Sequence, residues 1–205
     1  MMNLEKTQEY NQPFKHWEIF DCLDKSTLDE ISFSEIPEGQ RSYDGTRAAD
    51  NTGQGIDGKL RLFVTIENSK NFPNLTKLIN QFQNYKIYSK ISSFLKKDLS
   101  KSFVRLEIIS DKKGFWLKPH KDIKEKLMTM MIWSNPYNES EKLGTDMYND
   151  NYEIVKTVKY SHNNGYFFSS GEDTWHGLEK KDIVKERRCI QINYVSFKTD
   201  WPVIN

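Results

Sequence analysis

His120 and Asp122 lie two residues apart in the segment 118–122, and together they could bind a metal ion. On an extended strand, side chains two residues apart point to the same face, so an imidazole and a carboxylate would converge there. Such a pair supplies two of the three ligands of a facial metal site. The pair alone does not identify a site, because a chain with 4 histidines and 29 acidic residues can contain it by chance.

The third ligand would come from His176, which lies in a short predicted strand at 174–178. In a double-stranded β-helix, a late strand can lie beside an early one, so the separation between His120 and His176 suits that fold. Two imidazoles and one carboxylate on one face leave adjacent coordination positions open, as in non-haem Fe(II) sites. The competing interpretation is a pair of ordinary histidines at the edge of the core.

The elements that must position these residues are predicted from the spacing of apolar residues. Leu75, Leu78, Ile79 and Phe82 recur at helical spacing, and a second stripe of this kind runs through 87–95. From residue 102 onward, short apolar runs alternate with turn residues, which is typical of β-strands. Strands are predicted at 13–20, 60–66, 103–109, 115–121, 127–133, 145–148, 152–160, 166–170, 174–178 and 187–197.

These elements predict a mainly β protein with flanking helices. The core would be a double-stranded β-helix, the jelly roll of cupin-like proteins, buttressed by N-terminal α-helices. We expect one domain over 1–205, with supporting strands and helices in 1–101 and the catalytic core in 102–197. A short helix is predicted at 25–31, where Ser26 and Asp29 have capping-box spacing.

Polar residues near the predicted mouth of the fold are candidates for contact with a substrate. The stretch 37–59 is predicted to be a long loop, and its part 41–56 is the candidate substrate lid. Arg105 and Glu107 alternate on the first core strand and are expected to line the interior. The lid candidates are Arg41, Arg47, Asp50 and Asn51, and the lysines expected to form a solvated face are Lys118, Lys121, Lys124 and Lys126.

Composition excludes several classes of partner. The net charge of +1 and the pI of about 7.7 give no basic surface for nucleic acid and no polybasic membrane patch. The chain contains no stretch of roughly 18 apolar residues and no apolar segment at its N-terminus, so no membrane span is expected. Two cysteines, Cys22 and Cys189, do not form a disulfide framework, which favours a reducing, cytoplasmic location.

The order His120-x-Asp122, His176 and then an arginine opening an apolar strand resembles the Fe(II)/2-oxoglutarate-dependent dioxygenase superfamily. Within it, the pattern is similar to the prolyl-4-hydroxylase-like branch, and the resemblance covers residues 103–196. It implies that the two histidines and Asp122 bind Fe(II), with 2-oxoglutarate and O2 as co-substrates. It further implies hydroxylation of a substrate, with release of succinate and CO2.

In this superfamily the late arginine pairs with the distal carboxylate of 2-oxoglutarate, and both Arg187 and Arg188 are candidates. Neighbouring residues on a strand face opposite sides, so only one of them can point inward. Family members often carry Arg-x-small-polar here, which Arg187-x-Cys189 fits better than Arg188-x-Ile190. We therefore predict that Arg187 binds 2-oxoglutarate beside Cys189, and that the other arginine is solvated.

The strand at 127–133 would place Thr129, Met131 and Trp133 on one face. The resemblance implies that this face meets the co-substrate, so Thr129 and Trp133 are also candidates for binding it. The superfamily commonly has a tyrosine at the position of Trp133. Trp133 can donate a hydrogen bond only through its indole N–H.

The substrate itself is not specified by the sequence, and a small molecule, a sugar or a peptide fits equally well. One alternative keeps the jelly roll without redox chemistry, as a cupin-like metal- or sugar-binding module. Another is a hydrolase or isomerase that uses the same three ligands for zinc. The arginine on the strand at 187–197 disfavours that alternative, because hydrolysis needs no anchor for a dicarboxylate.

Overall fold

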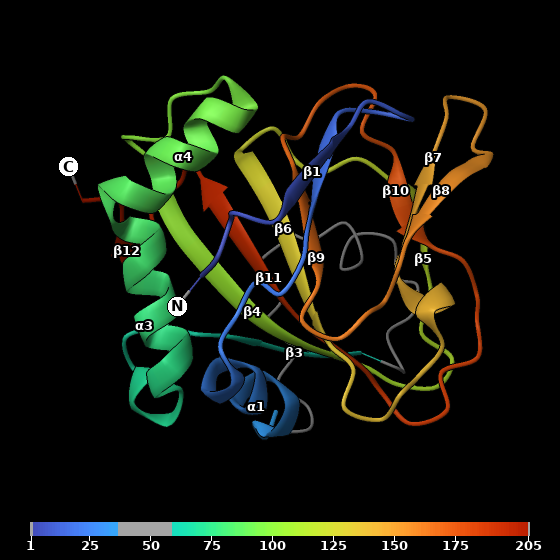
Figure 1. Cartoon of the computed structure of the whole chain (residues 1–205), viewed down its shortest axis with the longest axis horizontal. Helices are drawn as coiled ribbons and strands as arrows, with labels where there is room; N and C mark the ends of the chain where they lie inside the picture. Colours follow the sequence, from blue (N-terminus) through green and yellow to red (C-terminus); the bar gives the residue numbers. More distant parts are fainter. Residues whose placement is uncertain (1, 37–58, 205) are drawn as a thin grey trace.

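The computed structural model describes residues 2–36 and 59–204, in which strands form two antiparallel sheets and helices cover one of them (Figure 1). The predicted mainly β architecture is confirmed. The larger sheet has the order β1-β2-β9-β6-β11-β4-β12, with β3 also paired to β4, and the smaller sheet has the order β5-β10-β7-β8. The candidate lid residues in 41–56 lie outside the described residues.

The larger sheet has β11 at its centre, paired on one side with β4 and on the other with β6. Each of these three strands is nine residues long and carries the apolar runs recognised in the sequence. Its strands are β1 (Thr7–Tyr10), β2 (His16–Ile19), β3 (Lys59–Phe63), β4 (Phe103–Asp111), β6 (Lys126–Ser134), β9 (Gly165–Phe168), β11 (Arg187–Val195) and β12 (Trp201–Pro202).

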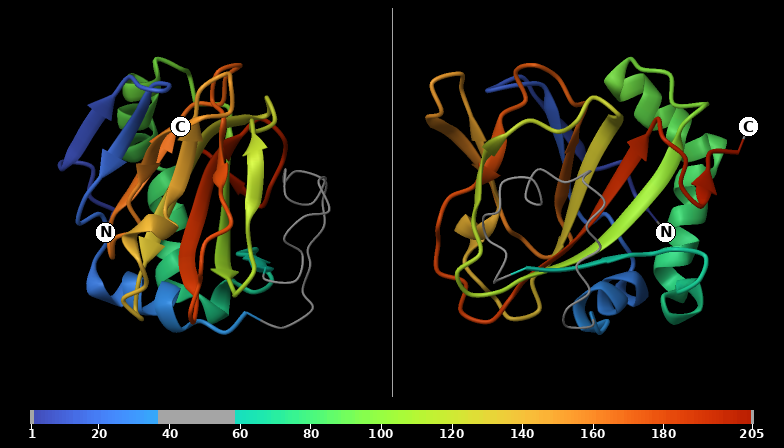
Figure 2. Two further views of the ribbon diagram at one scale, coloured as in Figure 1. Left: turned by 90° about the vertical axis from the view of Figure 1, so that its right-hand side faces the viewer. Right: turned by 180° about the vertical axis from the view of Figure 1, so that it is seen from behind.

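The smaller sheet lies on the side of the larger sheet that faces away from α3 (Figures 1 and 2). Its strands are β5 (Leu117–His120), β7 (Thr145–Tyr148), β8 (Ile154–Val158) and β10 (His176–Leu178). A 3₁₀ turn, Glu141–Leu143, leads into β7. The predicted strands at 115–121, 145–148, 152–160 and 174–178 thus belong to one sheet, and this sheet carries His120 and His176, the two candidate metal ligands.

The helices are α1 (Lys25–Phe33), α3 (Pro73–Gln83) and α4 (Tyr85–Leu95), with a 3₁₀ turn at Ser69–Asn71 before α3. Pro73 opens α3, where its fixed φ is compatible with the first turn. The predicted capping pair of α1 was wrong. Asp24 is the N-cap, because its carboxylate accepts a hydrogen bond of 3.0 Å from the backbone N–H of Thr27.

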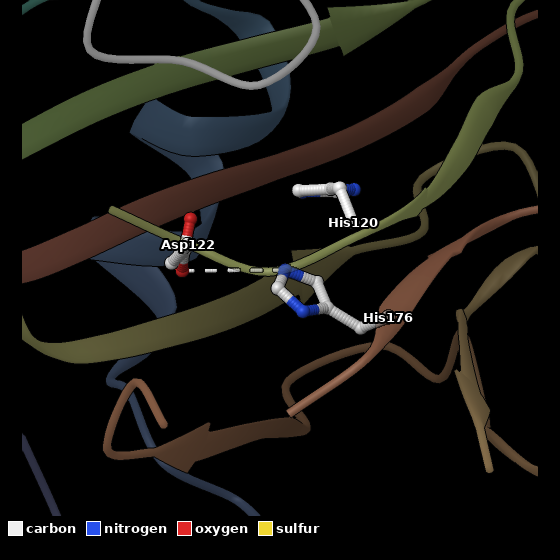
Figure 3. A group of neighbouring side chains, drawn as sticks. All are labelled: His120, Asp122 and His176. Carbon is white, nitrogen blue, oxygen red and sulfur yellow. Dashed lines mark ion pairs between the residues drawn. The ribbon is translucent and has the colours of Figure 1, made fainter. Parts of the chain in front are cut away.

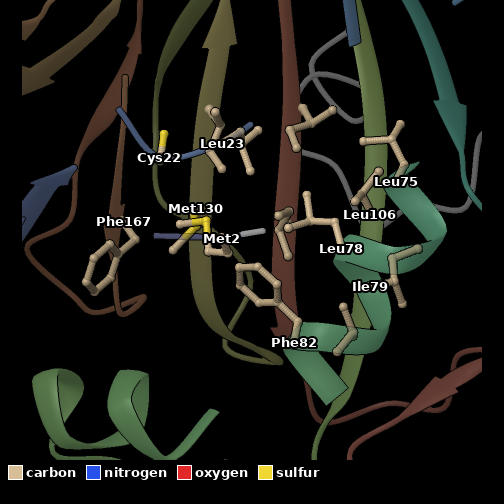
Figure 4. Close-up of a cluster of buried hydrophobic side chains, with 14 of the residues drawn as sticks. Met2, Cys22, Leu23, Leu75, Leu78, Ile79, Phe82, Leu106, Met130 and Phe167 are labelled. Atoms are coloured by element: carbon tan, nitrogen blue, oxygen red, sulfur yellow. The ribbon is translucent and has the colours of Figure 1, made fainter. Parts of the chain in front are cut away.

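Two apolar layers lie on the two faces of the larger sheet. On the helix side, the apolar stripe of α3 packs against Leu106 of β4, and Met130 of β6 belongs to the same apolar cluster (Figure 4). On the other side, a second cluster fills the space between the sheets and includes Phe115, Met131 and Tyr166. The candidate site lies in this second layer. No helix in the described ranges is long and apolar enough to cross a membrane.

Candidate active site

The two histidines of the predicted triad face each other across neighbouring strands. β10 pairs antiparallel with β5 so that His176 lies opposite His120, and their ring centroids are 4.3 Å apart. Asp122 follows β5 after one residue, and its carboxylate points toward the same space (Figure 3). One ligand atom from each of the three residues can be chosen so that all lie within 4.8 Å of one another.

Both imidazoles are held in the same tautomer. The Nδ1–H of His120 donates to the carbonyl of Lys118 at 2.9 Å, and that of His176 donates to the carbonyl of Thr174 at 2.9 Å. A carbonyl oxygen only accepts hydrogen bonds, so Nδ1 must carry the proton and Nε2 presents a lone pair. Burial lowers the pKa of both histidines, to about 3 for His120, which keeps both rings neutral as metal ligation requires.

The carboxylate of Asp122 is buried, with 3% of the side chain exposed, and both of its oxygens accept hydrogen bonds. Lys126 donates to Oδ1 at 2.6 Å, and Thr129 donates to Oδ2 at 2.6 Å. Burial alone would raise the pKa of Asp122, but Lys126, His176 and His120 outweigh this effect and hold the pKa below its usual range. Asp122 is therefore an anion that needs a cation beside it.

Two residues singled out in the sequence contact this carboxylate. Lys126 was expected on a solvated face, but its side chain is only 4% exposed because it turns inward to pair with Asp122. Thr129 was expected to meet the co-substrate. Its hydroxyl donates to the carboxylate of Asp122 and accepts a hydrogen bond of 3.0 Å from Asn193, and Thr129 is not among the residues that line the cavity. Its contacts favour a role in orienting the carboxylate.

The triad fits a transition-metal ion with a small adjustment. Nε2 of His176 and Oδ2 of Asp122 are 4.0 Å apart. Nitrogen and oxygen ligands lie about 2.0–2.2 Å from such an ion, so two adjacent ligands are about 3 Å apart when the ion is bound. The three ligand atoms lie within 4.8 Å of one another, so side-chain movements that shorten their separations by up to about 2 Å would close the site. Two neutral imidazoles and one carboxylate are the ligand set of non-haem Fe(II) sites.

A cavity of about 90 Å³ opens beside the triad, between the two sheets. All three triad residues line it, and so do two arginines, Arg61 of β3 and Arg187 of β11. Met131 lines it too, as its place on the predicted co-substrate face suggested. Thr145, Tyr166 and Gln191 complete much of the wall, and the sequence did not indicate a role for these three. The Tyr166 hydroxyl donates a hydrogen bond to Thr145 at 3.0 Å, which fixes the ring in the wall.

The two arginines share one buried carboxylate. Nη1 of Arg187 lies 2.6 Å from Oδ2 of Asp111, and Nη2 of Arg61 lies 2.7 Å from Oδ1. The side chain of Asp111 has no exposed surface, and those of the arginines are 6% and 8% exposed. A guanidinium can bind a carboxylate through two parallel hydrogen bonds, so the two arginines are candidate partners for a carboxylate in the cavity, where Glu107 is a further anion of the wall. Arg61 and Asp111 were not predicted, although both adjoin the predicted arginine.

Arg188 has its own partners on the opposite face of β11. Its guanidinium donates to the carbonyls of Ile31 and Ser34 next to α1, and it pairs with Glu186 at 2.9 Å. Arg188 therefore attaches α1 to the sheet and points away from the cavity. The expectation that one arginine of the pair is solvated was wrong, since Arg187 is 5% exposed and Arg188 is 4% exposed.

Trp133 and Cys189 lie behind the cavity wall rather than on it. Trp133 has no exposed surface and stacks on Tyr166 with ring centroids 5.5 Å apart. Its indole N–H has no hydrogen-bond partner within the described ranges. Cys189 is also fully buried, and burial raises the pKa of its thiol to about 12, so it is a neutral packing residue.

Arg105 and Glu107 of β4 were both expected to line the interior, but only one of them lines the cavity. Glu107 lines the cavity. Arg105 is buried beside it, where it donates to the side-chain carbonyl of Asn193 at 3.2 Å and lies over the rings of Phe63 and Phe197. Arg105 thus connects through Asn193 to the Thr129 hydroxyl that holds the triad carboxylate.

Comparison with known proteins finds matches at the level of the fold but none at the level of the sequence. No protein-family model matches the chain, and no curated protein matches it. Solved structures do match. A prolyl-4-hydroxylase from Pseudomonas putida aligns over 89% of this chain and 93% of its own, at a TM-score of 0.60 and 11% identity. A 2OG-Fe(II) oxygenase family oxidoreductase from Burkholderia pseudomallei aligns over 90% and 85%, at 0.59 and 11%.

The chain has the fold of these oxygenases. A third match is a prolyl hydroxylase from Trichoplax adhaerens, in complex with a peptide fragment of the hypoxia inducible factor oxygen degradation domain. It covers 88% of this chain and 83% of its own, at a TM-score of 0.56 and 14% identity. The resemblance to prolyl-4-hydroxylase-like oxygenases is thereby confirmed at the level of the fold, and the roles of single residues rest on their own geometry.

Proposed function

We propose that this protein is an Fe(II)- and 2-oxoglutarate-dependent oxygenase that hydroxylates a small molecule, a sugar or a peptide. The observation that carries the proposal is a single cavity that is lined by a candidate metal site at one end and by two arginines at the other. At one end, two neutral imidazoles and a buried carboxylate converge. At the other, two guanidiniums share a single carboxylate. The first end suits Fe(II), and the second suits a carboxylate.

His120, Asp122 and His176 would bind the metal through their Nε2 and carboxylate oxygen atoms. When bound with 2-oxoglutarate, Fe(II) supplies O2 activation coupled to oxidative decarboxylation, which yields succinate, CO2 and a hydroxylated product. Arg187 would hold the distal carboxylate of 2-oxoglutarate. Its Nη1 and Nε already donate to Asp111 and Leu143, which fixes the plane of the guanidinium and directs the remaining Nη2.

The rest of the chain would orient these groups and exclude water. Thr129 orients the triad carboxylate, and Trp133 and Cys189 support the wall by packing behind Tyr166 and Arg187. We further propose that the two sheets are the halves of a double-stranded β-helix, with α1, α3 and α4 buttressing the larger half. The peptide bound to the Trichoplax adhaerens neighbour supports keeping a peptide among the possible substrates.

The proposal is tested by an anaerobic optical titration of metal-free protein, first with Fe(II) and then with 2-oxoglutarate. Chelation of Fe(II) by the keto acid produces a weak visible charge-transfer band. The matched variants are Arg187→Met and Arg188→Met, because both remove a buried, ion-paired arginine from adjacent positions of β11. Both variants should be less stable, but only Arg187→Met should raise the concentration of 2-oxoglutarate needed for the band.

If Fe(II) binds and no band forms with 2-oxoglutarate, the co-substrate assignment fails. If the two arginine variants shift the titration equally, the anchoring role of Arg187 fails. Once the band is established, release of succinate in the presence of candidate small molecules, sugars and peptides identifies the substrate class.

A further inference from the structure

The ammonium group of Lys126 lies at the metal site itself. Its Nζ is 2.6 Å from Oδ1 of Asp122, and the two side chains are only 4% and 3% exposed. An isolated buried carboxylate is very costly in free energy, so one that persists is paired with a cation. Without a metal ion, Lys126 provides that cation, and it also lines the cavity beside the triad.

The two oxygens of Asp122 have different surroundings. Oδ2 lies 4.0 Å from Nε2 of His176 and accepts from Thr129, so it faces the other metal ligands. Oδ1 is held by Lys126. An oxygen already held by an ammonium group is less available to a metal ion, so Asp122 would ligate through Oδ2.

We propose that Lys126 is an internal counter-ion of the metal site, with two effects on metal binding. In the metal-free protein it neutralises Asp122 and stabilises the fold around the triad. When a divalent ion binds, the ammonium remains beside it, restricts Asp122 to one-oxygen ligation and lowers the affinity by repulsion between like charges. This inference rests on the proposed metal centre of His120, Asp122 and His176.

A purely structural lysine would behave differently. If Lys126 only oriented Asp122, its removal would misplace a ligand and weaken metal binding. If it is a counter-ion, its removal leaves Asp122 unneutralised until a metal ion arrives, so the metal-free protein loses stability while metal binding becomes tighter. The sign of the change in metal affinity therefore separates the two roles.

The test measures the Kd of Mn(II), which is stable toward oxidation, and the Tm of the metal-free protein. Lys126→Met removes the charge at nearly constant length, and Lys126→Gln also removes it while keeping a hydrogen-bond donor. Lys126→Arg keeps the charge, and Lys124→Met is the matched control at a nearby exposed lysine. We expect both uncharged variants to lower the Tm of the metal-free protein and to bind Mn(II) at least tenfold more tightly. Lys126→Arg and Lys124→Met should bind Mn(II) as the wild type does.

If Lys126→Met is unfolded without metal, Lys126→Gln and chelator competition on Mn(II)-loaded Lys126→Met give the same comparison. The inference is overturned if neither uncharged variant binds Mn(II) more tightly than the wild type, or if Lys126→Arg tightens binding to the same extent. The wild type and His176→Ala test the metal centre separately. Binding of Mn(II) that is lost in His176→Ala upholds the centre whatever the lysine variants do, and failure of the wild type to bind removes the centre itself.

Discussion

Gly177 offers a direct test of the idea that the spacing between β5 and β10 sets the metal site. A Cβ atom at this position would lie 2.6 Å from the carbonyl oxygen of Leu117 and 2.9 Å from that of Lys118. Ordinary van der Waals contacts begin at 3.4 Å, so Gly177→Ala would require the strands to separate by about 0.8 Å. Both contacts are to backbone atoms, which cannot rotate away.

This displacement acts on the two histidines. Gly177 adjoins His176, and the carbonyl of Lys118 is the acceptor that orients His120. Metal–ligand distances tolerate changes of only about 0.2 Å, so a shift of this size would spoil the geometry. We expect Gly177→Ala to weaken Mn(II) binding by roughly 10- to 100-fold, as loss of a supporting contact does at other metal sites.

The assay is titration with Mn(II), with far-UV circular dichroism to establish that the variant is folded. Gly171→Ala is the matched control, because its added Cβ would lie 3.1 Å from Oδ1 of Asp173, a side chain that can rotate away. It should bind Mn(II) as the wild type does. A folded Gly177→Ala protein with unchanged Mn(II) affinity would refute the claim that close approach of β5 and β10 sets the site.

Two further predictions concern buried polar groups. Trp133→Phe should lower stability by roughly 1–2 kcal/mol, because the smaller ring leaves space at a fully buried position. It should leave the 2-oxoglutarate titration unchanged, because the indole N–H has no partner in the described structure. A much weaker 2-oxoglutarate response would show that this N–H binds the co-substrate. In the metal-free protein, burial lowers the pKa of His120 from 6.5 to about 3 and also lowers that of His176. Below pH 6.5 the unfolded chain therefore binds more protons than the folded one. As the pH is lowered below 6.5, the free energy of unfolding should decrease by up to about 1.4 kcal/mol per pH unit for each histidine. Urea denaturation at pH 7, 6 and 5 measures this slope, and a slope in His176→Gln as steep as in the wild type would contradict the assignment.

The central strands could be predicted because their continuous apolar runs correspond to their burial in the structure. β4, β6 and β11 are buried on both faces, so their apolar runs follow directly from the sequence. β1 was not predicted, because Thr7–Tyr10 is a short, polar strand at the end of the sheet order. Its pairing with β2 depends on tertiary structure rather than on its own residues.

The candidate metal ligands could be predicted from the order His120-x-Asp122 and His176, although Asp122 lies just beyond β5 and its carboxylate is oriented by Lys126 and Thr129. The partners of Arg187, the proposed anchor, could not be predicted, since they come from strands whose order the sequence does not specify. Asp111 lies opposite Arg187 in the register of β4 and β11, and Arg61 reaches the same carboxylate from β3. Only the order β3-β4-β11 brings these three charges together.

The two adjacent arginines of β11 connect the site to the helices. Arg187 points into the cavity and pairs with Asp111, while Arg188 points to the opposite face and holds the end of α1 through Ile31. Because the side chains of a strand alternate, a shift of β11 by one residue would turn Arg187 away from the cavity and Arg188 toward it. Each arginine finds its acceptors only in the observed register, so the bonds that attach α1 also fix which guanidinium faces the cavity.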